Sequence, residues 1–301
     1  MIRARASLGL TKLRRRAALA AVCRSAGLDP AGAELLNDSI NVVYRLTTAP
    51  VVVRLRRDTA RAAVTRQVTL ARWLADAGAP VSRLLETAQP VTARGYVATF
   101  WESADAPEVD WRVEHLGVAL RDLHALGDHE DLPEWAPFTT LRTRIGRPDL
   151  PAGLTAGDRR WLAREVATLE QSYAEVAPTL RLGVLHGDAH IGNLLRSVDG
   201  RPVLCDLDQV ARGPQLQDLV PTAVNAARFG FKRRQRALVH AYGLDVTRHE
   251  AWPVLRRVRE LSTTTYGLLK AGHAPRFRDQ AFHRLRTLQD GDDATRWGPY
   301  G

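Results

Sequence analysis

Residues that form disulfides or ligate soft metals are scarce in this sequence. Its 301 residues include one methionine and two cysteines, Cys23 and Cys205, which match no metal-binding or redox spacing. Cys205 stands in a strand-like apolar run, so we interpret it as a buried, reduced core thiol. A reduced pair of cysteines fits a cytoplasmic protein.

Long apolar segments are also missing. The longest candidate, Ala17 to Cys23, is far shorter than the roughly 18 residues that a membrane helix needs. The basic segment before it lacks the apolar core and cleavage site of a signal peptide, so we expect an amphipathic helix there. With 45% hydrophobic and 25% charged residues, the chain is typical of soluble globular proteins, and no membrane partner is expected.

Aromatic residues make up only 6% of the chain, although its net charge is +10. The positive charge lies at the two ends, because residues 1–36 carry +5 and residues 221–301 carry +8. No aromatic side chains are interleaved with it as in a base-stacking platform, so nucleic-acid binding is an alternative and not the main expectation. Residues 102–134 have a net charge of −8. They form either a solvated acidic face or part of a binding site, to which Asp105, Glu108, Asp110 and Glu114 are the candidate contributors.

The hydrophobic pattern changes near residue 102. Before it, β-branched runs predict strands at 34–36, 41–47, 51–56 and 95–101, and a helix at 59–77. After it, most of the chain has helical spacing, beginning with a stripe that ends at His124, which we interpret as a hydrogen-bonded core histidine. The sequence therefore predicts an α+β protein with a strand-rich lobe at 1–101, including a leading helix at 1–33, and a helical lobe at 102–301.

The segment from Val184 to Leu219 contains the most specific pattern. His186, Asp188 and Asn193 form H-x-D-x-x-x-x-N, the spacing of a kinase catalytic loop. In that chemistry the aspartate accepts the proton of the substrate hydroxyl, and the asparagine binds a metal ion. Asp206 follows a predicted strand at 202–205, where kinases place a second metal-binding carboxylate. We therefore expect Asp188 to be catalytic and Asn193 with Asp206 to bind Mg²⁺.

The spacing between the two metal ligands gives a further prediction. Asp199-Gly200 is a strong signal for a two-residue hairpin turn. Such a turn would place Asn193 directly opposite Asp206, with Cβ atoms about 5 Å apart on one face. One Mg²⁺ ion could then take an oxygen from each side chain.

Other readings of the same residues stay open. His186, Asp188 and His190 form H-x-D-x-H, a pattern found in metal-dependent oxygenases and hydrolases, but that leaves Asn193 and Asp206 unexplained. Alternatively, His186 braces the catalytic loop and His190 packs in it. The chain could also be a nucleotide-binding relative that has lost turnover.

HGDAHIGNLL followed by VLCDLDQVARGPQLQDL resembles the aminoglycoside phosphotransferase family, which includes relatives of choline kinase. Leu116-Gly117 to Leu123-His124 is similar to the family's L-G-x-x-L-x-x-L-H segment. The resemblance implies a protein-kinase-like fold with a small antiparallel-sheet N-lobe that binds nucleotide and a larger, mainly helical C-lobe that binds the acceptor. It also implies Mg²⁺ with ATP or GTP as donor and a small hydroxylated molecule as acceptor. His186 and Asp208 are expected to support the site, and the oligomeric state is left open.

The resemblance assigns several small-lobe residues as well. Ser39 lies where family members place the loop that covers the phosphates, and Arg54 where a Lys or Arg pairs with the α- and β-phosphates. Gln67 replaces the glutamate expected to pair with that cation, and we expect its amide to accept a hydrogen bond from Arg54. The hinge that contacts the purine is expected at Phe100, Trp101 and Glu102. The acceptor itself is not identified by the sequence.

Overall fold

The computed structural model describes residues 2–38, 41–103 and 110–300, with the backbone alone for residues 2–11. These residues form two compact units. The first unit comprises Met1–Trp111, His129–Asp131 and Gly192–Asp208, and the second comprises Arg112–Asp128, Leu132–Ile191 and Gln209–Gly301. A segment from the middle of the chain thus belongs to the strand-rich first unit.

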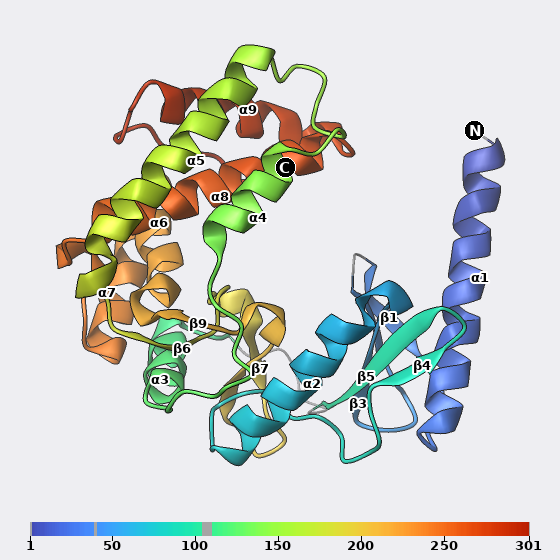
Figure 1. The fold of residues 1–301 in the computed structure, drawn as a ribbon. Coiled ribbons are helices and arrows are strands. Elements are labelled where there is room, and N and C mark those ends of the chain that lie inside the picture. Colours follow the sequence, from blue (N-terminus) through green and yellow to red (C-terminus); the bar gives the residue numbers. More distant parts are fainter. Residues whose placement is uncertain (1, 39–40, 104–109, 301) are drawn as a thin grey trace. The chain divides into compact units, whose positions relative to one another are not determined.

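The first unit is built on a five-stranded antiparallel sheet in the order β1-β2-β3-β5-β4 (Figure 1). The strands are β1 (Glu34–Asp38), β2 (Val42–Arg45), β3 (Val51–Arg57), β4 (Val91–Ala93) and β5 (Tyr96–Glu102). Alternation along β3 buries Val51, Val53 and Leu55 and turns Val52 and Arg54 to the other face. Since Val53 pairs with Phe100 and Val52 with Trp101, Phe100 lies on the core side and Trp101 on the side of Arg54.

Two helices accompany this sheet. The leading helix α1 (Ile2–Ser25) ends well before residue 33, and its last turns bury Ala18, Leu19, Val22 and Cys23 in the same apolar cluster as Val53 and Phe100. Helix α2 (Arg61–Asp76) buries an apolar stripe that includes Val64, Val68 and Ala71, as its sequence spacing predicted. The same helix also buries the polar side chain of Gln67.

The hairpin of β7 (Leu194–Arg196) and β8 (Pro202–Leu204) completes the first unit. Its backbone is bonded to residues 80–82, because Ser82 N–H donates to the carbonyl of Leu204 over 2.8 Å and Leu204 N–H donates to that of Pro80 over 2.7 Å. Leu194 pairs with Leu204, so the predicted register of this hairpin is wrong by one residue. The Cys205 N–H donates to the Asn193 carbonyl, which places Cys205 opposite Asn193 in place of Asp206.

The turn explains the shift in register. Ser197 N–H donates to the carbonyl of Arg201, and Gly200 N–H donates to that of Ser197, which leaves three residues in the loop in place of two. Gly200 has a φ of +86°, as the last residue of such a bulged turn requires. The Ser197 hydroxyl also accepts from Arg201 N–H and fixes the longer loop.

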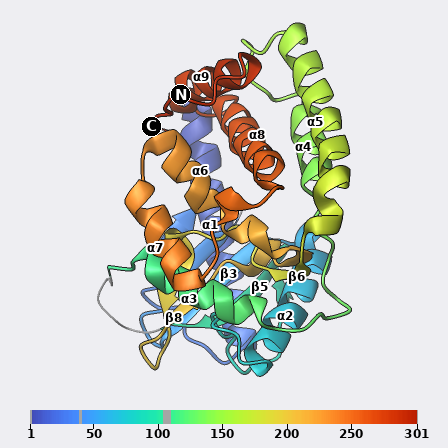
Figure 2. The ribbon, with the colours of Figure 1, turned by 90° about the vertical axis from the view of Figure 1, so that its left-hand side faces the viewer.

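The second unit is mostly helical (Figure 2). Its helices are α3 (Val113–His124), α4 (Pro137–Ile145), α5 (Ala156–Val176), α6 (Val220–Phe229), α7 (Lys232–Tyr242), α8 (Trp252–Ala271) and α9 (Arg278–Gln289). A two-stranded antiparallel ribbon joins β6 (Leu182–Leu185) to β9 (Ala211–Pro214). An apolar core gathers residues of α4, α5, α8 and α9, among them Leu141, Leu162, Leu261 and Leu285. No helix among the described residues is long and apolar enough to cross a bilayer.

Candidate functional site

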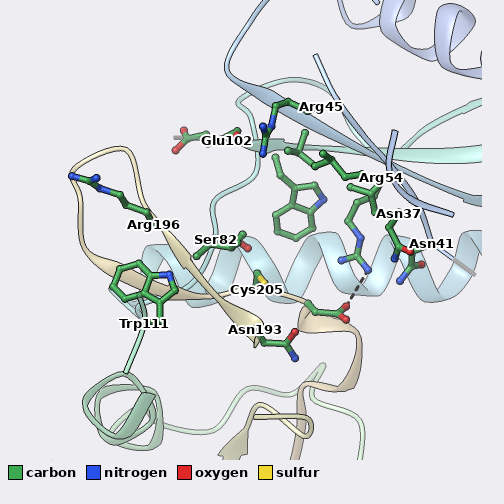
Figure 3. A pocket seen from close by; sticks show the side chains of 17 residues that line it. Asn37, Asn41, Arg45, Arg54, Ser82, Glu102, Trp111, Asn193, Arg196 and Cys205 are labelled. Atoms are coloured by element: carbon green, nitrogen blue, oxygen red, sulfur yellow. Dashed lines mark hydrogen bonds and ion pairs between the residues drawn. The ribbon is translucent and has the colours of Figure 1, made fainter. Parts of the chain in front are cut away.

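The first unit contains a pocket of about 440 Å³, a size that suits a nucleotide or other small ligand (Figure 3). The outward face of the sheet supplies its roof, because alternation along β2 and β3 leaves Val43, Arg45, Val52 and Arg54 free of the core. The remaining lining residues are Leu36, Asn37, Asn41, Ser82, Trp101, Glu102, Ser103, Trp111, Asn193, Leu195, Arg196, Cys205 and Asp206.

Arg54 forms the charged centre of this pocket. Its Nη2 lies 3.1 Å from Oδ1 of Asp206 and 3.0 Å from Oδ2 of Asp208, so one guanidinium joins both carboxylates. Its Cζ is 5.9 Å from the centre of the Trp101 ring, which adds a cation–π contact. Figure 3 shows the Arg54 side chain reaching from the sheet toward the segment that follows β8. The strand arginine is therefore held on the pocket side by partners far along the chain.

Asp208 receives further donors, and Gln67 is one of them. The Gln67 amide nitrogen donates to Oδ1 of Asp208, and Asn41 Nδ2 donates to Oδ2 over 2.9 Å. Within the described residues Gln67 makes no hydrogen bond to Arg54, so the expected bond between those two is wrong. The carboxylate that contacts both Arg54 and Gln67 is Asp208. A neutral amide at position 67 fits this arrangement because it can donate to that carboxylate.

Asn193 and Asp206 line the same pocket although they are not cross-strand partners. Asp206 has a φ of +60°, a left-handed conformation that aspartate tolerates better than most residues. The chain thus leaves the ladder of β8 at this residue. A carboxylate and an amide oxygen are hard donors that suit Mg²⁺, which commonly takes only one or two protein ligands beside water and phosphate oxygens. The two residues present therefore fit the expected ion.

The three predicted hinge residues are not equally accessible from the pocket. Trp101 and Glu102 line the pocket, as does Ser103, whereas Phe100 is fully buried in the core behind the sheet. The Phe100 N–H donates to the Gln89 side chain. The N–H groups of Glu102 and Ser103 donate to backbone carbonyls within the first unit. Trp101 and Glu102 are thus the expected hinge residues that line the pocket.

Several lining residues were not found from the sequence. Cys205 is half-buried and lines the pocket, so its placement in the core was wrong, whereas Cys23 is a buried core thiol. Burial, and after it the charge of Asp206, raises the pKa of Cys205 to about 11. Ser82, Trp111 and Arg196 had no motif to mark them. Proximity to the predicted hairpin was the only signal for Arg196.

Five of the residues predicted for the site do not line this pocket or lie outside the described residues. Ser39, expected in the phosphate-covering loop, lies outside the described residues, as do Asp105 and Glu108. Asp110 and Glu114 are exposed and do not line the first unit's pocket.

The second unit holds the H-G-D segment directly after β6. Asp218 accepts hydrogen bonds from the backbone N–H of His186 over 2.6 Å and of Gly187 over 2.9 Å. His124 Nε2 lies 3.0 Å from the same carboxylate and Nδ1 lies 2.8 Å from the Tyr242 hydroxyl, which confirms a hydrogen-bonded core histidine. Burial alone would raise the pKa of Asp218, but the hydrogen bond and charge of His124 outweigh it, so this pKa is lowered. A buried carboxylate therefore fixes the backbone of the loop.

Glycine at position 187 is required by its surroundings. Its φ is +83°, and a Cβ atom there would lie 2.2 Å from the carbonyl oxygen of Gln209. The tight turn directs the next residue, Asp188, away from the core, and its side chain is 31% exposed. The fully buried His186 accepts a long hydrogen bond of 3.4 Å at Nδ1 from the Asp188 N–H.

Two basic side chains lie against Asp188. Arg259 Nη1 is 3.4 Å from Oδ1, and His190 Nε2 is 3.8 Å from Oδ2. Over the described part of the chain, no three His, Cys, Asp or Glu side chains form a group that could hold a metal ion. His186, Asp188 and His190 therefore do not assemble the triad that the H-x-D-x-H alternative needs.

Comparison with models of known protein families matches residues 32–261 to the phosphotransferase enzyme family. The chain belongs to this family. The match spans most of the sequence and includes the pocket, the H-G-D segment and Asp218. It confirms the predicted family and the predicted class of enzyme, a phosphotransferase with an alcohol group as acceptor. No curated protein matches the sequence of this phosphotransferase.

Solved structures share the fold of this phosphotransferase family member. A choline kinase from Streptococcus pneumoniae is 16% identical, with a TM-score of 0.66 over 91% of this chain and 96% of its own. An aminoglycoside phosphotransferase from Streptomyces rimosus in complex with ADP and streptomycin is 20% identical, with a TM-score of 0.57 over 80% of this chain and 96% of its own. A choline/ethanolamine kinase family protein from Mesorhizobium loti is 21% identical, with a TM-score of 0.62 over 93% of this chain and 94% of its own. The predicted protein-kinase-like fold is confirmed.

Proposed function

We propose that this phosphotransferase moves the γ-phosphate of ATP or GTP to a hydroxyl group of a small molecule in a magnesium-dependent reaction. The observation that carries the proposal is the charged wall of the first unit's pocket, where Arg54 contacts Asp206 and Asp208 and Asn193 lines the same cavity. Support comes from the ADP complex of the similar aminoglycoside phosphotransferase. That likeness favours an adenine nucleotide as donor.

The residues of this charged wall and of the hinge have separate proposed roles. Arg54 would leave Asp206 and donate to the α- and β-phosphates, since a guanidinium binds phosphate oxygens in pairs. Asn193 and Asp206 would hold Mg²⁺, which when bound neutralises charge on the phosphate oxygens. Asp208 keeps Arg54 positioned through its 3.0 Å contact, with Gln67 as a second donor to the same carboxylate. Trp101 and Glu102, which line the pocket, would contact the base.

Asp188 is the proposed proton acceptor. In the reaction the acceptor oxygen bonds to the γ-phosphorus, the bond from that phosphorus to the β–γ bridging oxygen breaks, and the nucleoside diphosphate leaves. The hydroxyl proton passes to Asp188. Because the transition state of phosphoryl transfer is loose, orientation of the hydroxyl matters more than a strong base. The bonds from His186 and Gly187 to Asp218 supply this orientation by fixing the loop.

Phosphate transfer from radiolabelled ATP to a library of hydroxylated small molecules tests the proposal. Asp188→Asn should lower transfer by a factor of about 100 or more while nucleotide affinity is kept. Asp206→Asn should weaken Mg²⁺-nucleotide binding itself. Asp199→Asn is a matched control, because Asp199 is an exposed carboxylate in the turn of the same hairpin.

Full transfer by Asp188→Asn would contradict the assigned base. Nucleotide binding without transfer to any acceptor would support the alternative of a non-catalytic relative. Steep, salt-dependent binding of nucleic acid without nucleotide binding would favour the alternative of a nucleic-acid-binding protein.

A further inference from the structure

Cationic side chains gather along the face of α8 that carries Arg259, the partner of Asp188. Arg259, Thr263, Tyr266 and Lys270 follow one another at intervals of three or four residues and so share one face of the helix. Arg259 contacts Asp188 over 3.4 Å. Lys270 Nζ lies 5.3 Å from the centre of the Tyr266 ring, which is partly exposed.

Arg144 reaches the same face from α4. Its Nη1 donates to the backbone carbonyl and to the hydroxyl of Ser262, both over 3.1 Å, and its Cζ is 6.0 Å from the centre of the Tyr266 ring. Burial lowers the pKa of Arg144, and the nearby charge of Arg259 lowers it further. Arg144 thus links Arg259 to the pair formed by Tyr266 and Lys270, and these four residues are here called the Tyr266 patch.

In the part of the chain that the structure describes, the cations of this patch outnumber the carboxylates beside them. Within the described residues neither Arg144 nor Lys270 has a carboxylate within 4 Å, and the carboxylate partner of Arg259 is Asp188. Arginines on other faces of α8 do have separate partners, since Arg257 pairs with Glu165 over 2.6 Å and Arg256 with Glu260 over 2.9 Å. Arg144 and Arg259 thus set two guanidinium groups against the one carboxylate of Asp188, and Lys270 adds positive charge farther along α8.

We infer that the acceptor carries an anionic group, a carboxylate or a phosphate, near the hydroxyl that receives the phosphate. This inference rests on the proposed function, because it names the charge of the acceptor in that reaction. Guanidinium groups pair with carboxylates and phosphates in matching geometry. A polycationic acceptor would meet like charge at the Tyr266 patch, and like-charge contacts select against such partners. The hydroxylated acids and sugar phosphates are therefore the substrate class that this patch favours.

Matched ligands on one carbon skeleton test the inference. Glucosamine, glucose, glucuronate and glucose 6-phosphate share the pyranose ring and differ mainly in charge, and calorimetry measures their binding without requiring turnover. Glucuronate or glucose 6-phosphate should bind at least about tenfold more tightly than glucosamine, and comparison of the two anions distinguishes a carboxylate from a phosphate site. Arg259→Gln and Arg144→Gln should each remove most of this preference.

Arg142→Gln is the matched control. Arg142 lies on α4 like Arg144, but its side chain is half exposed and pairs with Glu170. The inference is overturned if glucosamine binds as tightly as the anions, if no anion binds, or if all variants bind anions equally.

Transfer assays with the same ligands separate this inference from the proposed function. Efficient phosphorylation of glucosamine, insensitive to Arg144→Gln, would overturn the inference and leave the phosphotransferase function intact. An equal fall in kcat for every acceptor in both Arg259→Gln and Arg144→Gln would also overturn it, because the two arginines would then bind the transferred phosphate and not the acceptor. Anion binding that depends on Arg144, in a protein that transfers no phosphate, would support the patch and contradict the proposed function.

Discussion

Replacing Gln67 by glutamate puts a second carboxylate against Asp208, in a position where the native amide nitrogen donates a hydrogen bond. The family pattern alone suggests that this change restores a missing ion pair with Arg54 and improves nucleotide binding. The structure predicts the opposite, because Asp208 already holds Arg54 over 3.0 Å and Gln67 is almost fully buried.

The size of the effect follows from these contacts. The change removes a hydrogen bond to a charged acceptor, which contributes about 1.5–3 kcal/mol. Two carboxylates about 3 Å apart also repel by about 5 kcal/mol at an effective dielectric constant near 20. Protonation of one of them and the attraction of Arg54 offset much of that repulsion. We expect Gln67→Glu to lower the free energy of unfolding by about 2 kcal/mol and to weaken Mg²⁺-ATP binding about tenfold.

Denaturant unfolding and calorimetry measure both effects. Like charge beside it raises the pKa of the new glutamate, so the stability deficit is largest near pH 8 and shrinks as the pH falls toward 5. Gln67→Met removes the hydrogen bond without adding charge and separates the two contributions. Gln67→Glu combined with Asp208→Asn exchanges carboxylate and amide and should recover most of the stability. Tighter ATP binding by Gln67→Glu alone would show that Asp208 does not fill the place of the missing glutamate.

Three further predictions concern other parts of the molecule. In thermal unfolding, Gly187→Ala should lower the free energy of unfolding by about 2 kcal/mol or more, because the new Cβ would lie 2.2 Å from the carbonyl oxygen of Gln209. Gly27→Ala is the control and should cost about 1 kcal/mol, because Gly27 also has a positive φ, +70°, but open space around it. Asp218→Asn should destabilise by about 3–5 kcal/mol, since it leaves buried donors without their charged acceptor. The lowered pKa of Asp218 means that its stabilising contribution is present above about pH 4 and is lost below it, so the Asn variant should show a flatter acid unfolding profile. Cys205, with its pKa raised to about 11, should react slowly with iodoacetamide at pH 8 and faster toward pH 10, and rapid alkylation at pH 8 would contradict this environment.

The sequence predicts the kinase-like fold well because its signals are local or highly specific. Alternation along β3 and the helical stripe of α2 depend on neighbouring residues, and the H-x-D-x-x-x-x-N spacing marks the catalytic loop. The predicted hairpin register is wrong because the turn is one residue longer than the Asp199-Gly200 signal indicates. Ser197 accepts the Arg201 N–H and stabilises a three-residue loop, which the Asp199-Gly200 signal does not reveal.

The partner of Gln67 was beyond sequence reasoning for a different reason. Asp208 is 141 positions away along the chain, and only the folded first unit brings the two side chains together. Likewise, Cys205 follows an apolar strand and looks like a core residue, although the chain leaves β8 just before the left-handed Asp206. Contacts between distant segments, more than secondary structure, determine which residues line the pocket.

Nucleotide binding by the first unit's pocket through magnesium and Asp206 is the step on which the proposed function depends. Calorimetric titration of ATP and GTP, each with and without Mg²⁺, into the wild type and Asp206→Ala measures it. We expect saturable binding that requires both Mg²⁺ and Asp206, and the nucleotide that binds more tightly is the donor. Equal binding without Mg²⁺ or in Asp206→Ala, or no binding of either nucleotide, would show that the pocket does not have this role.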